Sequence, residues 1–222
     1  MTIQTEQAVM GVRPSSRSWA VDTTAQRLAG VVMLILAAGF LTVIMLGGSI
    51  APGYDYVGGA ISDLGVIAET ALLFNGTLVA IGLLNIVGGY LFYRSHGKAW
   101  ILSIFVLGGI GAIGAGFFPL STGGLHGLFA LFGFAFFNLE AMAAATVLPR
   151  PMNGISLVAG IAGAAFVGLM VIGDAGNTAA FGVIGHGGTE RMIVYPVMLW
   201  LVALGGYLIG EPGRATRRGK VR

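Results

Sequence analysis

Five side chains with carboxylate or imidazole groups are the first candidates for chemistry in this chain: Asp63, His126, Asp174, His186 and Glu190. They occur in three separate polar stretches, so a fold that brings the stretches together would gather them at one site. Carboxylates and imidazoles are the usual ligands of catalytic zinc and similar metals. A divalent metal held by three or four such ligands can activate water for hydrolysis. We therefore predict a metal set of His126, His186 and Asp63, with Glu190 and Ser62 as catalytic groups.

The spacing of these residues supports the metal hypothesis only in part. His186 and Glu190 are four residues apart and would share a face if a helix began before them. Gly187 and Gly188 lie between them, and a glycine pair disfavours helix. The chain also lacks the HExxH pattern of zinc proteases. The metal site therefore depends on loops that converge in space.

Two other interpretations of the same residues stay open. In the first, Ser62 and Asp63 cap a helix and Glu190 does the same at another helix start, while Asp174 pairs with Arg191. In the second, the cluster binds a lipid head group or a small ligand without chemistry, as a small transporter or binding protein would. The predicted ligand-binding residues are Asp63, Asp174, Arg191 and Asn75.

The composition indicates which elements must position these residues. Of 222 residues, 56% are hydrophobic and only 9% are charged, whereas soluble domains carry about 25% charged residues. This excludes a cytosolic enzyme, a secreted disulfide scaffold and a disordered chain. The absence of cysteine excludes disulfides and thiolate-bound metals. The net charge of +3 does not indicate nucleic-acid binding, because the basic residues flank apolar segments.

Six apolar segments are long enough to cross a bilayer, which takes about 20 residues each. They predict an all-α, six-helix membrane bundle over residues 28–210, preceded by a polar basic segment at 1–27 and followed by a basic tail at 211–222. Pro119 and the following glycines separate the third span from the fourth. The predicted spans are 28–51, 70–93, 99–119, 126–148, 154–172 and 191–209.

The basic residues predict the orientation of the bundle. With six spans, every Lys and Arg except Arg191 falls on the same side as the two ends of the chain. By the positive-inside rule, both termini are then cytoplasmic and the protein is a multi-pass cell-membrane protein. The carboxylate and imidazole cluster lies at the outer end.

One carboxylate, Glu140, falls inside a predicted span, where a charge costs a few kcal/mol on insertion scales, about 2.5–3.5 at the centre. Asn85 and Ser103 are expected at the same depth. We predict a Glu140–Asn85 hydrogen bond that stabilises helix association. The functional alternative is a proton or ion relay through Glu140.

Rows of small residues predict close helix contacts, within the chain or between copies in a homo-oligomer. The rows have a spacing of four and comprise Gly108, Ala112 and Gly116 in the third span, and Gly160, Ala164 and Gly168 in the fifth.

Several short motifs together resemble a bacterial and archaeal membrane family catalogued as domain of unknown function 998. They are the segment PGYDYVGGAISDLG after the first span, Phe118-Pro119, His126 at the start of the fourth span, and Gly-Thr-Glu-Arg at the entry to the sixth. The resemblance implies a six-span integral membrane protein. It singles out Ser62, Asp63, His126, Glu190 and Arg191.

Overall fold

The computed structural model describes residues 22–210, so most of the predicted basic N-terminal segment and the whole predicted tail lie outside the described residues. The described chain is entirely helical. Its six long helices are α1 (Thr23–Ile50), α2 (Ala71–His96), α3 (Ala99–Phe117), α4 (Gly124–Ala145), α5 (Met152–Asp174) and α6 (Gly185–Gly210). Its three short 3₁₀ helices are η1 (Ile61–Gly65), η2 (Leu120–Thr122) and η3 (Thr178–Ile184).

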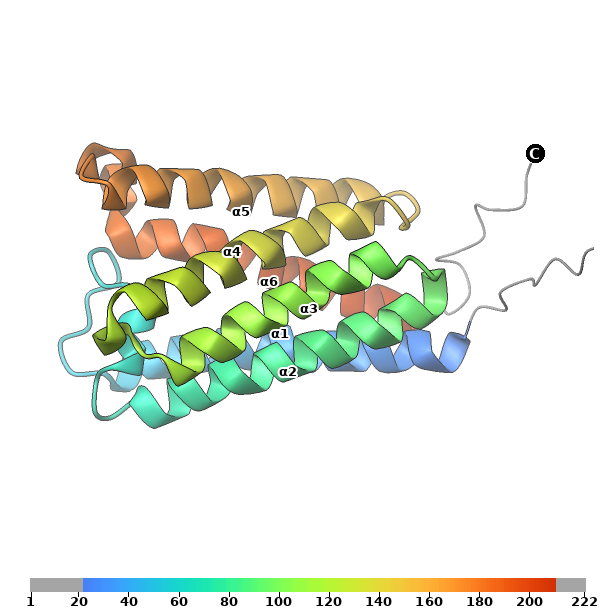
Figure 1. Cartoon of the computed structure of the whole chain (residues 1–222), viewed down its shortest axis with the longest axis horizontal. Helices are drawn as coiled ribbons and strands as arrows, with labels where there is room; N and C mark the ends of the chain where they lie inside the picture. Colours follow the sequence, from blue (N-terminus) through green and yellow to red (C-terminus); the bar gives the residue numbers. More distant parts are fainter. Residues whose placement is uncertain (1–21, 211–222) are drawn as a thin grey trace, which may run out of the picture.

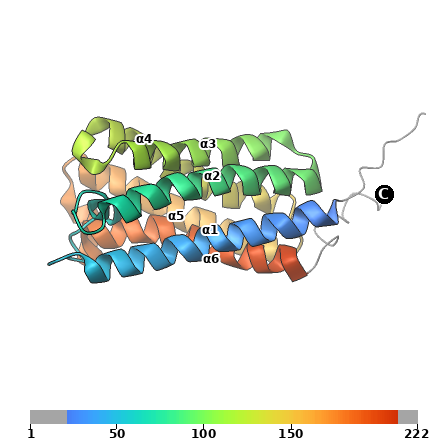
Figure 2. The ribbon, with the colours of Figure 1, turned by 90° about the horizontal axis from the view of Figure 1, so that it is seen from below.

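The six long helices run side by side along one axis (Figures 1 and 2). Each helix packs against the next one in sequence, and α6 packs against α1, so the helices form a closed ring. The three 3₁₀ helices and the segment 51–60 all lie at one end of the bundle, on the left in Figure 1. We call this end the loop end.

The outward faces of the helices are apolar. Leu72, Phe117 and Val158 are 90%, 68% and 70% exposed, respectively. Each of the six helices is long and apolar enough to cross a membrane, and a helix satisfies its backbone hydrogen bonds without water. The exposed apolar faces are therefore the surface that contacts lipid, as the composition predicts.

The first helix begins earlier than its apolar segment. Asp22 is its N-cap, and the carboxylate accepts a 3.0 Å hydrogen bond from the Ala25 N–H. The same carboxylate forms a 2.9 Å ion pair with Arg94 at the end of α2. A side-chain cap thus extends α1 to Thr23, beyond the predicted start at residue 28.

The start of α6 corrects the expectation that Gly187 and Gly188 would prevent a helix there. The helix begins at Gly185 and includes both glycines. The Gly187 N–H donates to the Val57 carbonyl at 2.9 Å, and a side chain at position 187 would collide with the Gly59 carbonyl. Glycine is thus used for close backbone contact, which outweighs its low helix propensity.

The small-residue rows pack within the chain at most positions. Gly116 faces the backbone of α2 at the Asn75 carbonyl, and Gly160 faces the backbone of α4 at the Asn138 carbonyl. Gly108 leaves room for the Glu140 side chain. Gly168 has no neighbour within 4 Å of where its side chain would start, so at that position the second row makes no close contact within the described chain.

Candidate functional site

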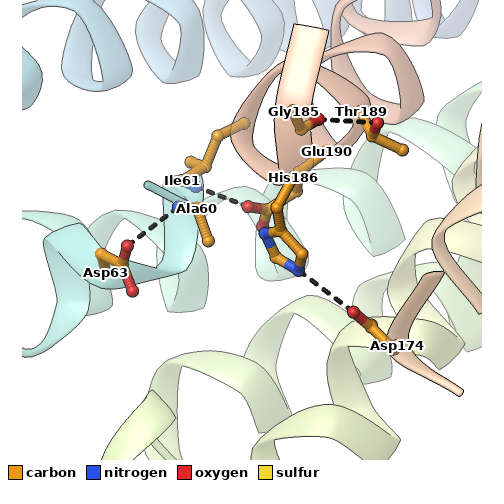
Figure 3. Close-up of polar contacts among 8 residues, drawn as sticks. All are labelled: Ala60, Ile61, Asp63, Asp174, Gly185, His186, Thr189 and Glu190. Atoms are coloured by element: carbon orange, nitrogen blue, oxygen red, sulfur yellow. Dashed lines mark hydrogen bonds and ion pairs between the residues drawn. The ribbon is translucent and has the colours of Figure 1, made fainter. Parts of the chain in front are cut away.

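The short helix η1 is held at its start by two carboxylates (Figure 3). Glu190, from α6, is 5% exposed and accepts a 2.5 Å hydrogen bond from the Ile61 N–H. Asp63, inside η1, accepts a 2.8 Å hydrogen bond from the Ala60 N–H. These are N–H groups at a helix start that lack intrahelical partners. In this structure Asp63 and Glu190 therefore act as caps.

The other end of η1 is held by α2. The Thr70 hydroxyl donates to the Leu64 carbonyl at 2.7 Å, and the Asn75 amide donates to the Gly65 carbonyl at 2.8 Å. Asn75 thus contacts backbone rather than an open pocket. Side chains from α2 and α6 fix η1 in place between them.

Arg191 fastens the segment 51–60 that leads into η1. One guanidinium nitrogen donates to the carbonyls of Tyr56 and Gly59 at 3.0 and 3.2 Å, and the other donates to the Tyr54 hydroxyl at 2.6 Å. The guanidinium also lies over the Tyr54 and Tyr56 rings, 5.6 and 5.1 Å from their centroids. We call this set the arginine clamp: Arg191 with Tyr54, Tyr56 and Gly59.

Tyr54 takes part in the arginine clamp in its neutral form. Its hydroxyl accepts from Arg191 and donates to the Ala60 carbonyl at 2.6 Å. Burial raises the pKa of the Tyr54 hydroxyl to about 12, although the neighbouring Arg191 opposes this shift. The phenol therefore keeps its proton across the physiological range.

Asp174 and His186 form a separate pair near the surface. Their side chains approach to 3.3 Å (Figure 3), and the Phe181 ring of η3 packs edge-on against the His186 ring. The predicted Asp174–Arg191 ion pair is absent from the described part of the chain, since Arg191 is taken up by the 51–60 segment.

The residues predicted to share a metal have different partners. Asp63 caps η1, His186 faces Asp174, and His126 bonds to a backbone carbonyl. Between Asp22 and Gly210, no three His, Asp or Glu side chains lie close enough together to hold a metal ion. The structure thus places the predicted ligands at one end of the bundle but does not gather them around one point.

His126 lies at the start of α4 and is 4% exposed. Its Nδ1 lies 2.7 Å from the Phe118 carbonyl oxygen, just after the end of α3. Because a carbonyl only accepts, Nδ1 carries the proton, and Nε2 of the neutral ring is then an acceptor. Nε2 is buried and has no hydrogen-bond partner.

His126 lines a cavity inside the bundle. The walls come from α1, α2, α3, α4 and α6, and most side chains that line it are apolar. Ile61 and Ser62 of η1 also line it, together with Glu190. The short helix η1 therefore contributes to the lining, whereas the segment before α6 (residues 174–184) does not.

A second buried polar contact joins α4 to α2. The Asn85 amide donates to Glu140 at 2.5 Å and to the Phe105 carbonyl at 3.0 Å, and both side chains are buried. This is the predicted hydrogen bond. The other predicted neighbour, Ser103, is exposed and donates within its own helix to the Ala99 carbonyl.

Sequence reasoning did not find the cavity or the role of Asn138 beside it. The Asn138 amide donates to the carbonyls of Phe134 and Ile193 at 2.8 and 3.2 Å, which joins α4 to α6. Small residues such as Gly111, Ala112 and Gly133 line the cavity on α3 and α4, and Gly111 also lies against the Gly133 backbone.

Comparison with known proteins agrees with this architecture. The family model described as "Protein of unknown function (DUF998)" matches residues 34–207, which include all six long helices in whole or in large part. Searches of curated proteins and of solved structures gave no match. Six helices able to span a membrane and a family match over most of its length show that the chain is a membrane protein of the DUF998 family.

Proposed function

We propose that this protein binds a small, mainly apolar molecule in the cavity between its helices. The observation that carries the proposal is His126, which lines an apolar cavity and whose buried Nε2 has no hydrogen-bond partner. A buried polar atom without a partner costs about 1–3 kcal/mol. A ligand that donates one hydrogen bond to Nε2 and fills the apolar space would remove that cost.

The lining of the cavity supports a ligand of this kind. Binding sites for small molecules are mostly apolar, with a few polar groups that fix orientation. This cavity has His126, Glu190 and Ser62 toward the loop end and phenylalanines along its walls. An amphiphilic molecule would place its polar end beside the polar residues at the loop end and its apolar body along the phenylalanines.

The distribution of charge supports the orientation of this site. Arg27, Arg94, Lys98 and Arg150 lie at the end of the bundle opposite the loop end or next to it in sequence, and basic residues are retained on the cytoplasmic side. We infer that both termini are cytoplasmic and that the loop end faces outward. The polar end of the cavity is then at the level of the outer leaflet.

A second candidate function is an accessory or transport role in which the polar residues at the loop end serve assembly. The contacts of Asp63, Asn75 and Arg191 favour this role for those three residues, since each one bonds to backbone of the loop end. It does not account for the unpaired Nε2 of His126. The two roles are compatible, because the capped loop end forms part of the cavity wall.

The experiment is mass spectrometry of small molecules extracted from the purified full-length protein. We expect a specific molecule to be enriched in the wild type and lost in two variants, His126→Phe, which removes the acceptor, and Ala130→Phe, which fills the cavity. His96→Phe is the matched control, because His96 also has an unpaired buried Nε2 but does not line the cavity. Identical extracts from the wild type and both cavity variants would refute the proposal.

A further inference from the structure

The polar end of the cavity shows which kind of ligand it suits, if the proposed binding function holds. The polar residues that line the cavity are His126, Glu190 and Ser62 at this end, and Asn138 farther along α4. Each one donates or accepts hydrogen bonds in known ways. The bonds already made within the protein show which donors and acceptors are left for a ligand.

The N–H donors of these side chains are already used. His126 Nδ1 bonds to the Phe118 carbonyl. Both amide hydrogens of Asn138 are accounted for by the Phe134 and Ile193 carbonyls. The Ser62 hydroxyl can donate or accept, so it does not select between ligands.

The acceptors are only partly used. His126 Nε2 has no partner. The Glu190 carboxylate accepts from the backbone N–H groups of Ile61 and Ser62, and two carboxylate oxygens offer about four acceptor positions. The polar end thus has free acceptors without matching N–H donors.

The charges of the lining residues favour a positively charged ligand. Among the described residues that line the cavity, Glu190 is the only acid and none is Lys or Arg. The guanidinium of the adjacent Arg191 is directed to Tyr54 and the 51–60 segment. The Glu190 carboxylate therefore has backbone partners but no cation beside it inside the cavity.

Aromatic rings line the remaining space. Phe40, Phe74, Phe129, Phe134 and Phe137 contribute to the cavity wall. Aromatic faces attract cations, and the attraction increases where water is excluded. Rings of this kind accept both the apolar body of a ligand and a positively charged group.

We propose that the cavity selects an amphiphilic amine, whose ammonium group donates to Glu190 and His126 Nε2 while its apolar chain lies among the phenylalanines. An alcohol of the same length can donate only one hydrogen bond and brings no charge. A carboxylate brings acceptors and a negative charge to a site that already has both.

The test uses three probes of equal chain length with the full-length protein in lipid nanodiscs: octylamine, 1-octanol and octanoate. Binding is measured by competition against labelled octylamine, with empty nanodiscs subtracted. We expect octylamine to bind at least tenfold more tightly than 1-octanol, and octanoate not to compete. The trimethylated form of octylamine keeps the charge but cannot donate, so it should bind more weakly than octylamine.

Glu190→Gln and His126→Phe assign the preference to residues. Glutamine can still accept from the Ile61 N–H, so η1 should be retained. We expect Glu190→Gln to weaken octylamine binding by roughly ten- to a hundredfold, the loss typical of a charged hydrogen bond, and to leave 1-octanol binding unchanged. Glu69→Gln is the matched control, because Glu69 is exposed and absent from the cavity lining, and it should leave both affinities unchanged.

The outcomes separate this inference from the binding function. If 1-octanol binds as tightly as octylamine and both depend on His126, the amine preference is refuted and the binding site stands. If no probe binds above empty nanodiscs, or if binding survives both His126→Phe and Ala130→Phe, the inference and the binding function both fall. The wild-type comparison of the probes decides the amine preference even if Glu190→Gln does not fold.

Discussion

The Glu140–Asn85 hydrogen bond gives a quantitative prediction about how this bundle is stabilised. The Asn85 amide bonds to Glu140 at 2.5 Å, and Gly108 on the third helix provides the room for the carboxyl group. Measured side-chain hydrogen bonds between membrane helices average about 0.6 kcal/mol and reach about 1.7. We expect a value in the upper part of this range, since both side chains are fully enclosed.

A double-mutant cycle measures this coupling energy. The variants are Asn85→Ala, Glu140→Ala and the double variant, and the observable is the free energy of unfolding in bicelles or mixed micelles. Each single variant leaves the other polar group without its partner, so each should destabilise by about 1–3 kcal/mol. The double variant should cost less than the sum by about 1–1.7 kcal/mol, which is the interaction between the two side chains.

A second cycle serves as the control. Ser103 bonds only to the Ala99 carbonyl in its own helix and is exposed, so Ser103→Ala and Glu140→Ala should be additive within about 0.5 kcal/mol. Glu140→Gln tests the same contact with the shape retained, and a glutamine oxygen can still accept from Asn85. A coupling energy near zero between Asn85 and Glu140 would refute the role assigned to this bond.

Three more predictions concern the loop end. Arg191→Met should release the segment 51–60 and raise its hydrogen-exchange rate with little effect in α3; unchanged exchange there would refute the clamp. Gly187→Ala should destabilise the protein by about 1–3 kcal/mol, the range for overpacking, because a methyl group would meet the Gly59 carbonyl, whereas Gly206→Ala, with no neighbour within 4 Å, should be tolerated in a thermal unfolding assay. Because the folded pKa of Tyr54 is raised to about 12, stability should be constant below pH 10 and fall as the pH rises from 10 to 12, while the unfolded chain loses its proton first; a Tyr54→Phe variant with the same alkaline loss of stability would contradict this.

The overall fold was predictable from sequence because a bilayer imposes simple requirements on a chain. Each span needs about 20 apolar residues, and the six segments predicted from that requirement correspond to the six long helices. The Glu140–Asn85 bond was also predictable, since both residues are polar within apolar segments and fall at equal depth. Burial in lipid leaves such groups few partners other than each other.

The loop end could be predicted only in part. The sequence marked Asp63, Glu190 and Arg191 as a group, and capping was one of the open interpretations. The partners of Arg191 are mainly backbone carbonyls, which have no signature in sequence. The early start of α6 also depends on a contact between Gly187 and Val57, which lie far apart in the chain.

The cavity was not predictable from local patterns. Its lining combines small residues of α3 and α4 with large side chains of α1, α2, α4 and α6. Facing positions depend on how each helix is rotated about its axis. A row of small residues indicates that a helix has a narrow face, but not whether a neighbouring helix or an open space lies against it.

The contacts of η1 have a consequence for the order in which the protein is made. The Ile61 N–H and its partner Glu190 are 129 residues apart, and α6 is the last of the six described helices to leave the ribosome. During synthesis the Ile61 N–H therefore lacks its Glu190 partner until α6 has been made. Insertion of α6 then completes two sets of contacts, since it closes the ring against α1 and holds the segment 51–60 through Arg191. A nascent chain that ends before Gly185 would lack both sets of contacts.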